Sequence, residues 1–169
     1  MRLSAKSEYG LRALIDIASC YGDGPVGSRD IAGRQQIPLK FLEQLVSSLR
    51  KAGILDSRRG AKGGFFLARP PGEVSVFEAV EALEGSLSPT KCVGDDAPTC
   101  ARTAQCAAQD VWNRAKVALR EALEEITLAD LVERQERYDS RERPEEHETS
   151  RVHESLRSGQ GGRRLRGGP

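Results

Sequence analysis

The chain has 169 residues, of which 38% are hydrophobic, 26 are Lys or Arg and 25 are Asp or Glu. This length fits one compact domain with appendages, and it is enough to bury a real core. No apolar run approaches the roughly 18 residues that a membrane span needs, and the first eight residues lack the apolar segment of a signal peptide. We therefore expect a cytoplasmic protein that has no contact with a membrane.

The net charge of +1 hides an asymmetry along the chain. Residues 1–70 carry 12 Lys and Arg against 6 Asp and Glu, whereas residues 71–138 carry 7 against 13. A basic module beside an acidic one suggests contact with a polyanion through one face. The only histidines, His147 and His153, lie in the polar last part of the chain, and no phosphate-binding glycine loop is present. These features favour a binding protein over an enzyme.

Three helices are predicted in the first 51 residues. Apolar residues recur at helical spacing from Leu11 to Ala18, and a short second helix runs from Ser28 to about Gln35. Pro38 is expected at the first position of the third helix, which ends near Lys51. Its predicted inner face consists of Leu39, Leu42, Leu45, Val46 and Leu49.

Two short strands are expected next, at residues 54–58 and 65–68, around a basic, glycine-rich turn. Three helices followed by such a hairpin outline a winged helix-turn-helix module over residues 1–71. The fold class is therefore mainly α.

The rest of the chain is expected to consist of two parts. Residues 72–136 contain a linker helix, a loop and further helices, and residues 137–169 form a disordered tail. A linker helix spans residues 74–83, an irregular loop spans 86–106, and a long helix runs from about Asp110 to Ile126. Thr127 and Asp130 resemble a capping box that opens a last short helix. The alanine-rich stripe of the long helix suits either a dimer interface or packing against the winged module.

The third helix and the hairpin carry the residues expected to bind double-stranded operator DNA. An amphipathic helix suits the major groove, where Gln44 could read adenine and Glu43 could accept a hydrogen bond from cytosine. Cations beside glycines in the hairpin suit phosphates or the minor groove. A solvated helix face and a charged hairpin tip are the plainer alternatives. The predicted DNA-binding set is Ser28, Arg29, Pro38, Lys40, Phe41, Glu43, Gln44, Ser47, Arg58, Arg59, Gly60 and Lys62.

Three of the four cysteines, Cys92, Cys100 and Cys106, lie within fifteen residues. Their spacing lacks a Cys-x2-Cys pair, which makes a structural zinc site less favoured. Soft thiolates in a loop suit an iron-sulfur cluster, whose fourth protein position would stay open. Exposed or oxidation-sensing thiols without a metal are the alternative.

Several segments resemble winged-helix regulators of the IscR/NsrR family. They are Met1-Arg2-Leu3-Ser4, Phe41-Leu42-Glu43-Gln44-Leu45, Leu49-Arg50-Lys51-Ala52-Gly53, the hairpin from Arg58 to Phe65, Val76 to Ala82, the three cysteines, and Ile126 to Leu131. The resemblance covers about residues 1–135. It implies a homodimeric transcription regulator, expected to be a repressor, with a long dimerisation helix and a cysteine-containing cluster loop. Its affinity for DNA would follow the state of a 2Fe-2S or 4Fe-4S cluster that senses redox state, nitric oxide or iron-sulfur supply.

Within this resemblance, Cys92, Cys100 and Cys106 correspond to cluster ligands. Seven residues separate the first two cysteines instead of the family's usual five, and Gln109 stands where one branch has a histidine ligand. The nitric-oxide-sensing branch instead implies Glu8 as a fourth ligand, reaching over from the partner subunit, with Asp95, Asp96 and Asp110 as weaker alternatives. The rival hypothesis is a cluster-free winged-helix regulator controlled by a protein partner, a small molecule or thiol oxidation.

Overall fold

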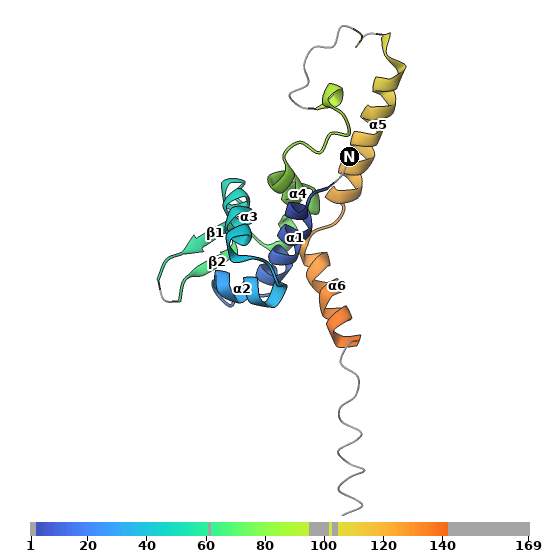
Figure 1. Ribbon diagram of the computed structural model, residues 1–169. Coiled ribbons are helices and arrows are strands. Elements are labelled where there is room, and N and C mark those ends of the chain that lie inside the picture. Colours follow the sequence, from blue (N-terminus) through green and yellow to red (C-terminus); the bar gives the residue numbers. More distant parts are fainter. Residues whose placement is uncertain (1–2, 61, 95–101, 103–104, 142–169) are drawn as a thin grey trace, which may run out of the picture. The chain divides into compact units, whose positions relative to one another are not determined.

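The computed structural model describes residues 3–60, 62–94, 102 and 105–141 (Figure 1). The described residues up to 135 form one compact unit, and the described residues 136–141 belong to a second. No helix in the described part of the chain is long and apolar enough to cross a membrane. The elements are α1 (Ala5–Ala18), α2 (Ser28–Gln35), α3 (Leu39–Lys51), β1 (Leu55–Arg58), β2 (Gly64–Leu67), the 3-10 turn η1 (Pro71–Glu73), α4 (Val76–Glu84), the 3-10 turn η2 (Lys91–Val93), α5 (Ala107–Glu124) and α6 (Leu128–Arg141).

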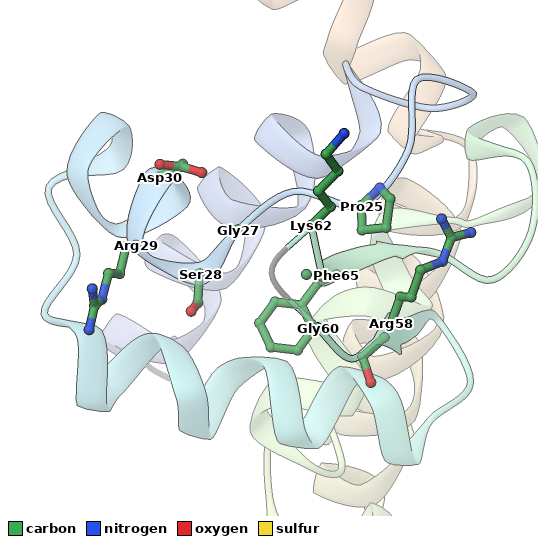
Figure 2. Close-up of a pocket in the computed structure, with 12 residues that line it drawn as sticks. Pro25, Gly27, Ser28, Arg29, Asp30, Arg58, Gly60, Lys62 and Phe65 are labelled. Atoms are coloured by element: carbon green, nitrogen blue, oxygen red, sulfur yellow. The ribbon is translucent and has the colours of Figure 1, made fainter.

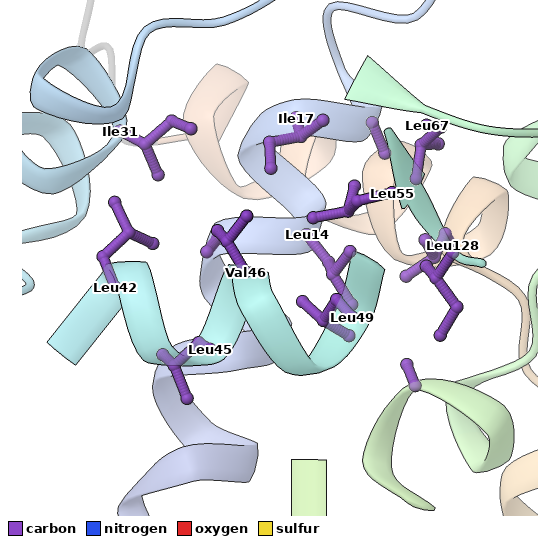
Figure 3. Packing of buried hydrophobic residues seen from close by; sticks show 14 of the residues in the cluster. Leu14, Ile17, Ile31, Leu42, Leu45, Val46, Leu49, Leu55, Leu67 and Leu128 are labelled. Carbon is purple, nitrogen blue, oxygen red and sulfur yellow. The ribbon is translucent and has the colours of Figure 1, made fainter. Parts of the chain in front are cut away.

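The main core lies between the first three helices and the hairpin. Apolar residues at helical spacing on α1 and α3 give each helix one buried stripe. Figure 3 shows these stripes facing each other, with Ile31 of α2 at one end and Leu128 of α6 at the other. Burying this apolar surface is the main favourable term in holding the module together. The fully buried large side chains are Leu14, Ile17, Ile31, Leu42, Leu45, Val46, Leu49, Ile54, Val74, Val80 and Leu128.

The beginning of α3 differs from the prediction in two respects. Pro38 is the N-cap residue, with an extended ψ of 127°, and the helix begins one residue later. Leu39, predicted on the inner face, is 37% exposed, whereas Leu42 is fully buried. The core contacts thus begin one turn into the helix, and the first residue of α3 faces outward.

The two strands form an antiparallel hairpin in which Leu55 pairs with Leu67 and Arg58 pairs with Gly64. The hairpin is also hydrogen-bonded to the segment before α2. The N–H of Val26 donates to the carbonyl oxygen of Phe65 at 2.8 Å, and the N–H of Phe65 donates back at 2.9 Å. This bridge fixes the hairpin, hereafter the wing, against the beginning of α2.

The fourth and sixth helices are tied together where each begins. The N–H of Val76 donates to the carbonyl oxygen of Ile126 at 2.8 Å, and the N–H of Leu128 donates to that of Val74 at 3.0 Å. Leu128 is buried in the same core as the first three helices. A second cluster consists of Val76, Phe77, Val80 and Leu87, against which Leu119 and Leu123 of α5 pack.

The boundaries downstream of α4 were only partly predicted. Helix α5 begins at Ala107, three residues earlier than expected, and the predicted irregular loop contains the turn η2. The capping box is confirmed: the N–H and Oγ1 of Thr127 donate to Oδ2 of Asp130 at 2.8 and 2.7 Å. Helix α6 continues to Arg141, beyond the predicted beginning of the tail, whose residues 142–169 lie outside the described part.

Candidate nucleic-acid interface and cysteine segment

Helix α3 presents an uninterrupted polar face to solvent. Lys40, Glu43, Gln44 and Ser47 are all exposed, while the opposite stripe is buried. Phe41 is half-buried and packs edge-on against Tyr9, with ring centroids 5.9 Å apart. The four polar residues are thus available to a ligand. Phe41 is only partly accessible, because it packs between α1 and α3.

A groove of about 780 Å³ separates the beginning of α2 from the wing (Figure 2). The charged ends of Arg29, Arg58 and Lys62 point in different directions from its walls, so that they are spread over its surface. Such an arrangement suits a ligand that carries several separate negative charges. The lining residues are Pro25, Gly27, Ser28, Arg29, Asp30, Ser57, Arg58, Gly60, Lys62, Gly63, Gly64 and Phe65.

Glycines allow the wing to approach its neighbours. A Cβ on Gly64 would overlap the carbonyl group of Val26, and one on Gly63 would overlap the carbonyl oxygen of Arg58. Gly60 has a φ of +113°, which L-residues rarely adopt. The wing's shape and its contact with the α2 end of the groove therefore depend on these three positions.

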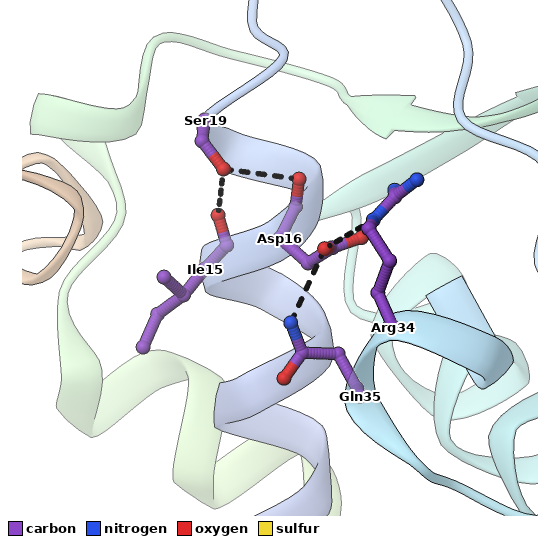
Figure 4. A network of polar contacts seen from close by, with 5 residues as sticks. All are labelled: Ile15, Asp16, Ser19, Arg34 and Gln35. Atoms are coloured by element: carbon purple, nitrogen blue, oxygen red, sulfur yellow. Dashed lines mark hydrogen bonds and ion pairs between the residues drawn. The ribbon is translucent and has the colours of Figure 1, made fainter. Parts of the chain in front are cut away.

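A polar network fixes α2 against α1 (Figure 4). Asp16 is only 8% exposed, and its carboxylate accepts two hydrogen bonds from Arg34, each of 2.8 Å, and one from Gln35 at 3.2 Å. The hydrogen bond to Asp16 raises the pKa of the Arg34 guanidinium. A bidentate pair of this kind sets orientation as well as distance. The network therefore positions α2, whose first residues border the groove.

Five of the predicted DNA-binding residues line the groove, and the predicted residues of α3 do not; the five are Ser28, Arg29, Arg58, Gly60 and Lys62. Ser28 is the first residue of α2, Arg29 follows it, and Pro38 caps α3. Arg59 is exposed at the wing but does not line the groove. The sequence prediction missed Pro25, Asp30 and Ser57 as lining residues, and the bridge between Val26 and Phe65 helps to bring their segments together.

The cysteine segment is described in part. Cys92 lies in η2 and Cys106 is the N-cap residue of α5; both are half-buried, and Cys100 lies outside the described residues. The turn η2 packs beside α5, and Nε2 of Gln109 donates to the carbonyl oxygen of Cys92 at 3.4 Å. The thiol of Cys92 lies 3.2 Å from Oγ1 of Thr90. The beginning of α5 thus holds the first cysteine.

Glu8 lies exposed on α1, beside a cavity of about 660 Å³. The cavity is mainly apolar and is bordered by the N-terminal turns of α1, by Val76 and Val80 of α4, and by Leu123 of α5. The carboxylate is therefore accessible from outside the chain. Cys20, the fourth cysteine, follows α1; it is half-buried and packs against the core.

The thiolates fit an iron-sulfur cluster in kind, since soft sulfur donors suit iron and half-buried thiols are reachable. Within the residues that the structure describes, no group of three or more His, Cys, Asp or Glu side chains gathers in one place. Two of the expected cysteine ligands, Cys92 and Cys106, are therefore located, and the third, Cys100, lies outside the described residues.

Comparison with known proteins bears on the whole compact unit. Residues 3–134 match the Rrf2 family, described as iron-dependent transcriptional regulators. The chain is 42% identical over 132 residues to Protein rrf2 of Nitratidesulfovibrio vulgaris, covering 78% of this chain and 87% of that protein. It is 38% identical over 152 residues to the HTH-type transcriptional regulator IscR of Enterobacter sp., covering 90% and 92% of the two chains.

A solved structure shares the fold. CymR of B. subtilis, titled the global cysteine regulator, superimposes with a TM-score of 0.65 at 35% identity, covering 79% of this chain and 97% of that one. The family match and these relatives confirm the resemblance drawn from the wing and helix segments, as well as the mainly α, winged-helix fold class. The chain belongs to the Rrf2 family of transcriptional regulators.

Proposed function

We propose that this protein is a homodimeric repressor that binds operator DNA and whose affinity for DNA is controlled by an iron-sulfur cluster. The observation that carries the DNA-binding part is the juxtaposition of an exposed polar helix face with a basic groove. Both belong to a module with a net charge of +6, and α2, whose first residues line the groove, packs against α3. Electrostatic attraction to phosphates would bring DNA to this face.

The two parts of the interface are expected to contact different parts of the DNA. The polar face of α3, with Glu43 and Gln44, would enter the major groove and contact base edges. The cations of the wing and α2, such as Arg29, Arg59 and Lys62, would contact phosphates or the minor groove and set the register on the duplex. Sequence preference would then depend on α3, and general affinity on the wing.

Helix α5 supports the proposal of a dimer. None of its residues is buried, although its last turns pack on α4, and Val111, Trp112 and Val117 are 59, 39 and 52% exposed. An apolar surface of this kind commonly marks an interaction site. Pairing through α5 would place two winged modules on a two-fold operator, as helix-turn-helix dimers require.

Cys92, Cys100 and Cys106 would hold the cluster, with Glu8 of the partner subunit as the fourth ligand. When bound, the cluster supplies redox and small-molecule chemistry at iron. A carboxylate is a harder ligand than a thiolate, which suits a site that responds to small molecules. The chain's contribution is to place the thiols: Gln109 holds the backbone at Cys92, and α5 begins directly after Cys106.

Anaerobic purification followed by iron and sulfide analysis tests the cluster, and titration of operator DNA with cluster-loaded and metal-free protein tests the control. We expect coloured, iron-containing protein and an affinity difference of about 5- to 150-fold, the range of typical allosteric coupling. Colourless, iron-free protein that binds operator fully would instead support the cluster-free regulator. If the protein contains iron but binds operator equally well with and without the cluster, the cofactor is supported and its control of DNA binding is refuted.

A further inference from the structure

The last residue of α4, Glu84, holds the N-terminal turn of α1. Oε1 of its carboxylate accepts hydrogen bonds from the N–H of Ser4 at 2.8 Å, from Oγ of Ser4 at 2.7 Å and from Oγ of Ser7 at 2.5 Å. Ser7 is only 3% exposed, so its hydroxyl would lack a water partner without this bond. Three donors from one helix thus meet one oxygen of another.

The position of this acid is unfavourable for an isolated helix. A carboxylate at a helix C-terminus is repelled by the helix dipole, so its place there needs a specific partner. Burial raises the pKa of Glu84, but hydrogen bonds from Ser7 and Ser4 outweigh this effect and place the pKa below its ordinary value. The group is therefore an ionised acceptor near neutral pH.

Close packing accompanies the hydrogen bonds. Gly10 of α1 lies directly against Leu83, and a Cβ on Gly10 would overlap that side chain. Ser4 also caps α1, because its Oγ accepts from the N–H of Lys6 at 3.1 Å. The first two turns of α1, which carry Glu8, are consequently held to the end of α4 by both polar and apolar contacts.

This contact lies between two functional parts of the chain. Gly85, with a φ of +84°, ends α4 directly after Glu84, and Cys92 follows seven residues later. On the other side, α1 packs against both α2 and α3. A movement of the cysteine segment that pulls on Glu84 would be passed to α1 and from there to the DNA-binding helices.

We propose that Glu84 is a positioning residue that joins the cysteine segment to the beginning of α1 and so links the state of that segment to the DNA-binding module. The contact of Glu84 with the beginning of α1, hereafter the joint, consists of its hydrogen bonds to Ser4 and Ser7, beside the apolar contact of Gly10 with Leu83. Its regulatory role rests on the proposed function, because it requires that the cysteine segment control DNA binding.

The test uses the full chain with Glu84→Gln, and Glu81→Gln as the matched control. Glu81 lies on the same helix, and in the part of the chain that the structure describes its carboxylate makes no hydrogen bond or ion pair. Ser7→Ala is the second variant, since it removes one donor to Glu84 without changing the charge. Circular dichroism confirms that each variant folds, and Ser7→Ala replaces Glu84→Gln if the latter does not.

The first measurement is hydrogen exchange of residues 3–11 in metal-free protein, which requires neither a cluster nor DNA. We expect the amides from Ser4 to Ser7 to exchange about tenfold faster in Glu84→Gln, in line with the loss of hydrogen bonds to a charged acceptor. Glu81→Gln should leave their exchange unchanged. Unchanged exchange in Glu84→Gln would overturn the joint, whatever the protein senses.

The second measurement is the ratio of operator affinities of cluster-loaded and metal-free protein. We expect this ratio to fall to within about threefold of one in Glu84→Gln and Ser7→Ala, from the range typical of allosteric coupling, and to stay at the wild-type value in Glu81→Gln. Faster exchange with a full wild-type ratio would overturn the link while leaving the joint. A wild-type ratio of one would contradict the proposed function, and the exchange result would then decide the joint alone.

Discussion

The substitution Arg59→Ala separates phosphate contacts from intramolecular effects. Arg59 is exposed and its side chain makes no hydrogen bond or ion pair within the described residues, whereas the Arg58 guanidinium lies 6.0 Å from the centre of the Phe66 ring. Removing Arg59 should therefore leave the fold intact. In a dimer it removes two phosphate contacts, so the slope of log affinity against log salt should fall by about 1.8.

This change in slope can be measured as a salt-dependent ratio of the two affinities. Between about 50 and 200 mM salt, the ratio of wild-type to Arg59→Ala affinity should shrink by about 12-fold. Fluorescence anisotropy with an operator duplex and an unrelated duplex measures it, and both duplexes should lose affinity alike. Arg50→Ala, which removes the same charge from the last turn of α3 and not from the wing, should change the slope less.

Gln44→Ala provides the opposite signature in the same assay. It should keep the salt slope and lose about 1 to 3 kcal/mol of discrimination between operator and unrelated DNA. An unchanged slope for Arg59→Ala, or identical behaviour of the two variants, would refute the division of work between the wing and α3.

Three further outcomes are expected. Gly64→Ala should detach the wing from the segment before α2. Operator affinity should fall at least about tenfold, and the free energy of unfolding measured in urea should fall by about 1 to 3 kcal/mol. Gly33→Ala, which has open space around it, should be neutral or stabilising. Val117→Glu should convert the dimer to monomer in light scattering, and a retained dimer would show that α5 is not its interface. Hydrogen bonds from Thr127 lower the pKa of Asp130, so the stability it contributes is complete above the ordinary carboxyl pKa and is lost as the pH falls through the folded-state pKa. Asp130→Asn should flatten the acid side of the stability curve in pH-dependent thermal melting, and an unchanged curve would contradict this assignment.

The beginning of α6 and the apolar stripe of α3 show which features a local sequence pattern can predict. Thr127 and Asp130 were predicted to form a capping box, and the structure confirms it because the motif needs only residues three apart. The inward stripe of α3 was predicted correctly from Leu42 onward, while Leu39 was misplaced. Periodicity assigns a face to each helix, but it does not reveal where a neighbouring element begins to cover that face.

The amino-acid sequence alone determined the order of helices and strands, the basic character of the first module, the polar face of α3 and the family resemblance, because these depend on residue spacing and local backbone preference. The tertiary structure decided which distant segments meet. Val26 pairs with Phe65 to form the groove, Asp16 receives Arg34, and Glu84 receives Ser4 and Ser7. Such pairs, 18 to 80 residues apart, have no local signal, since their energy appears only when packing brings the partners within hydrogen-bonding distance.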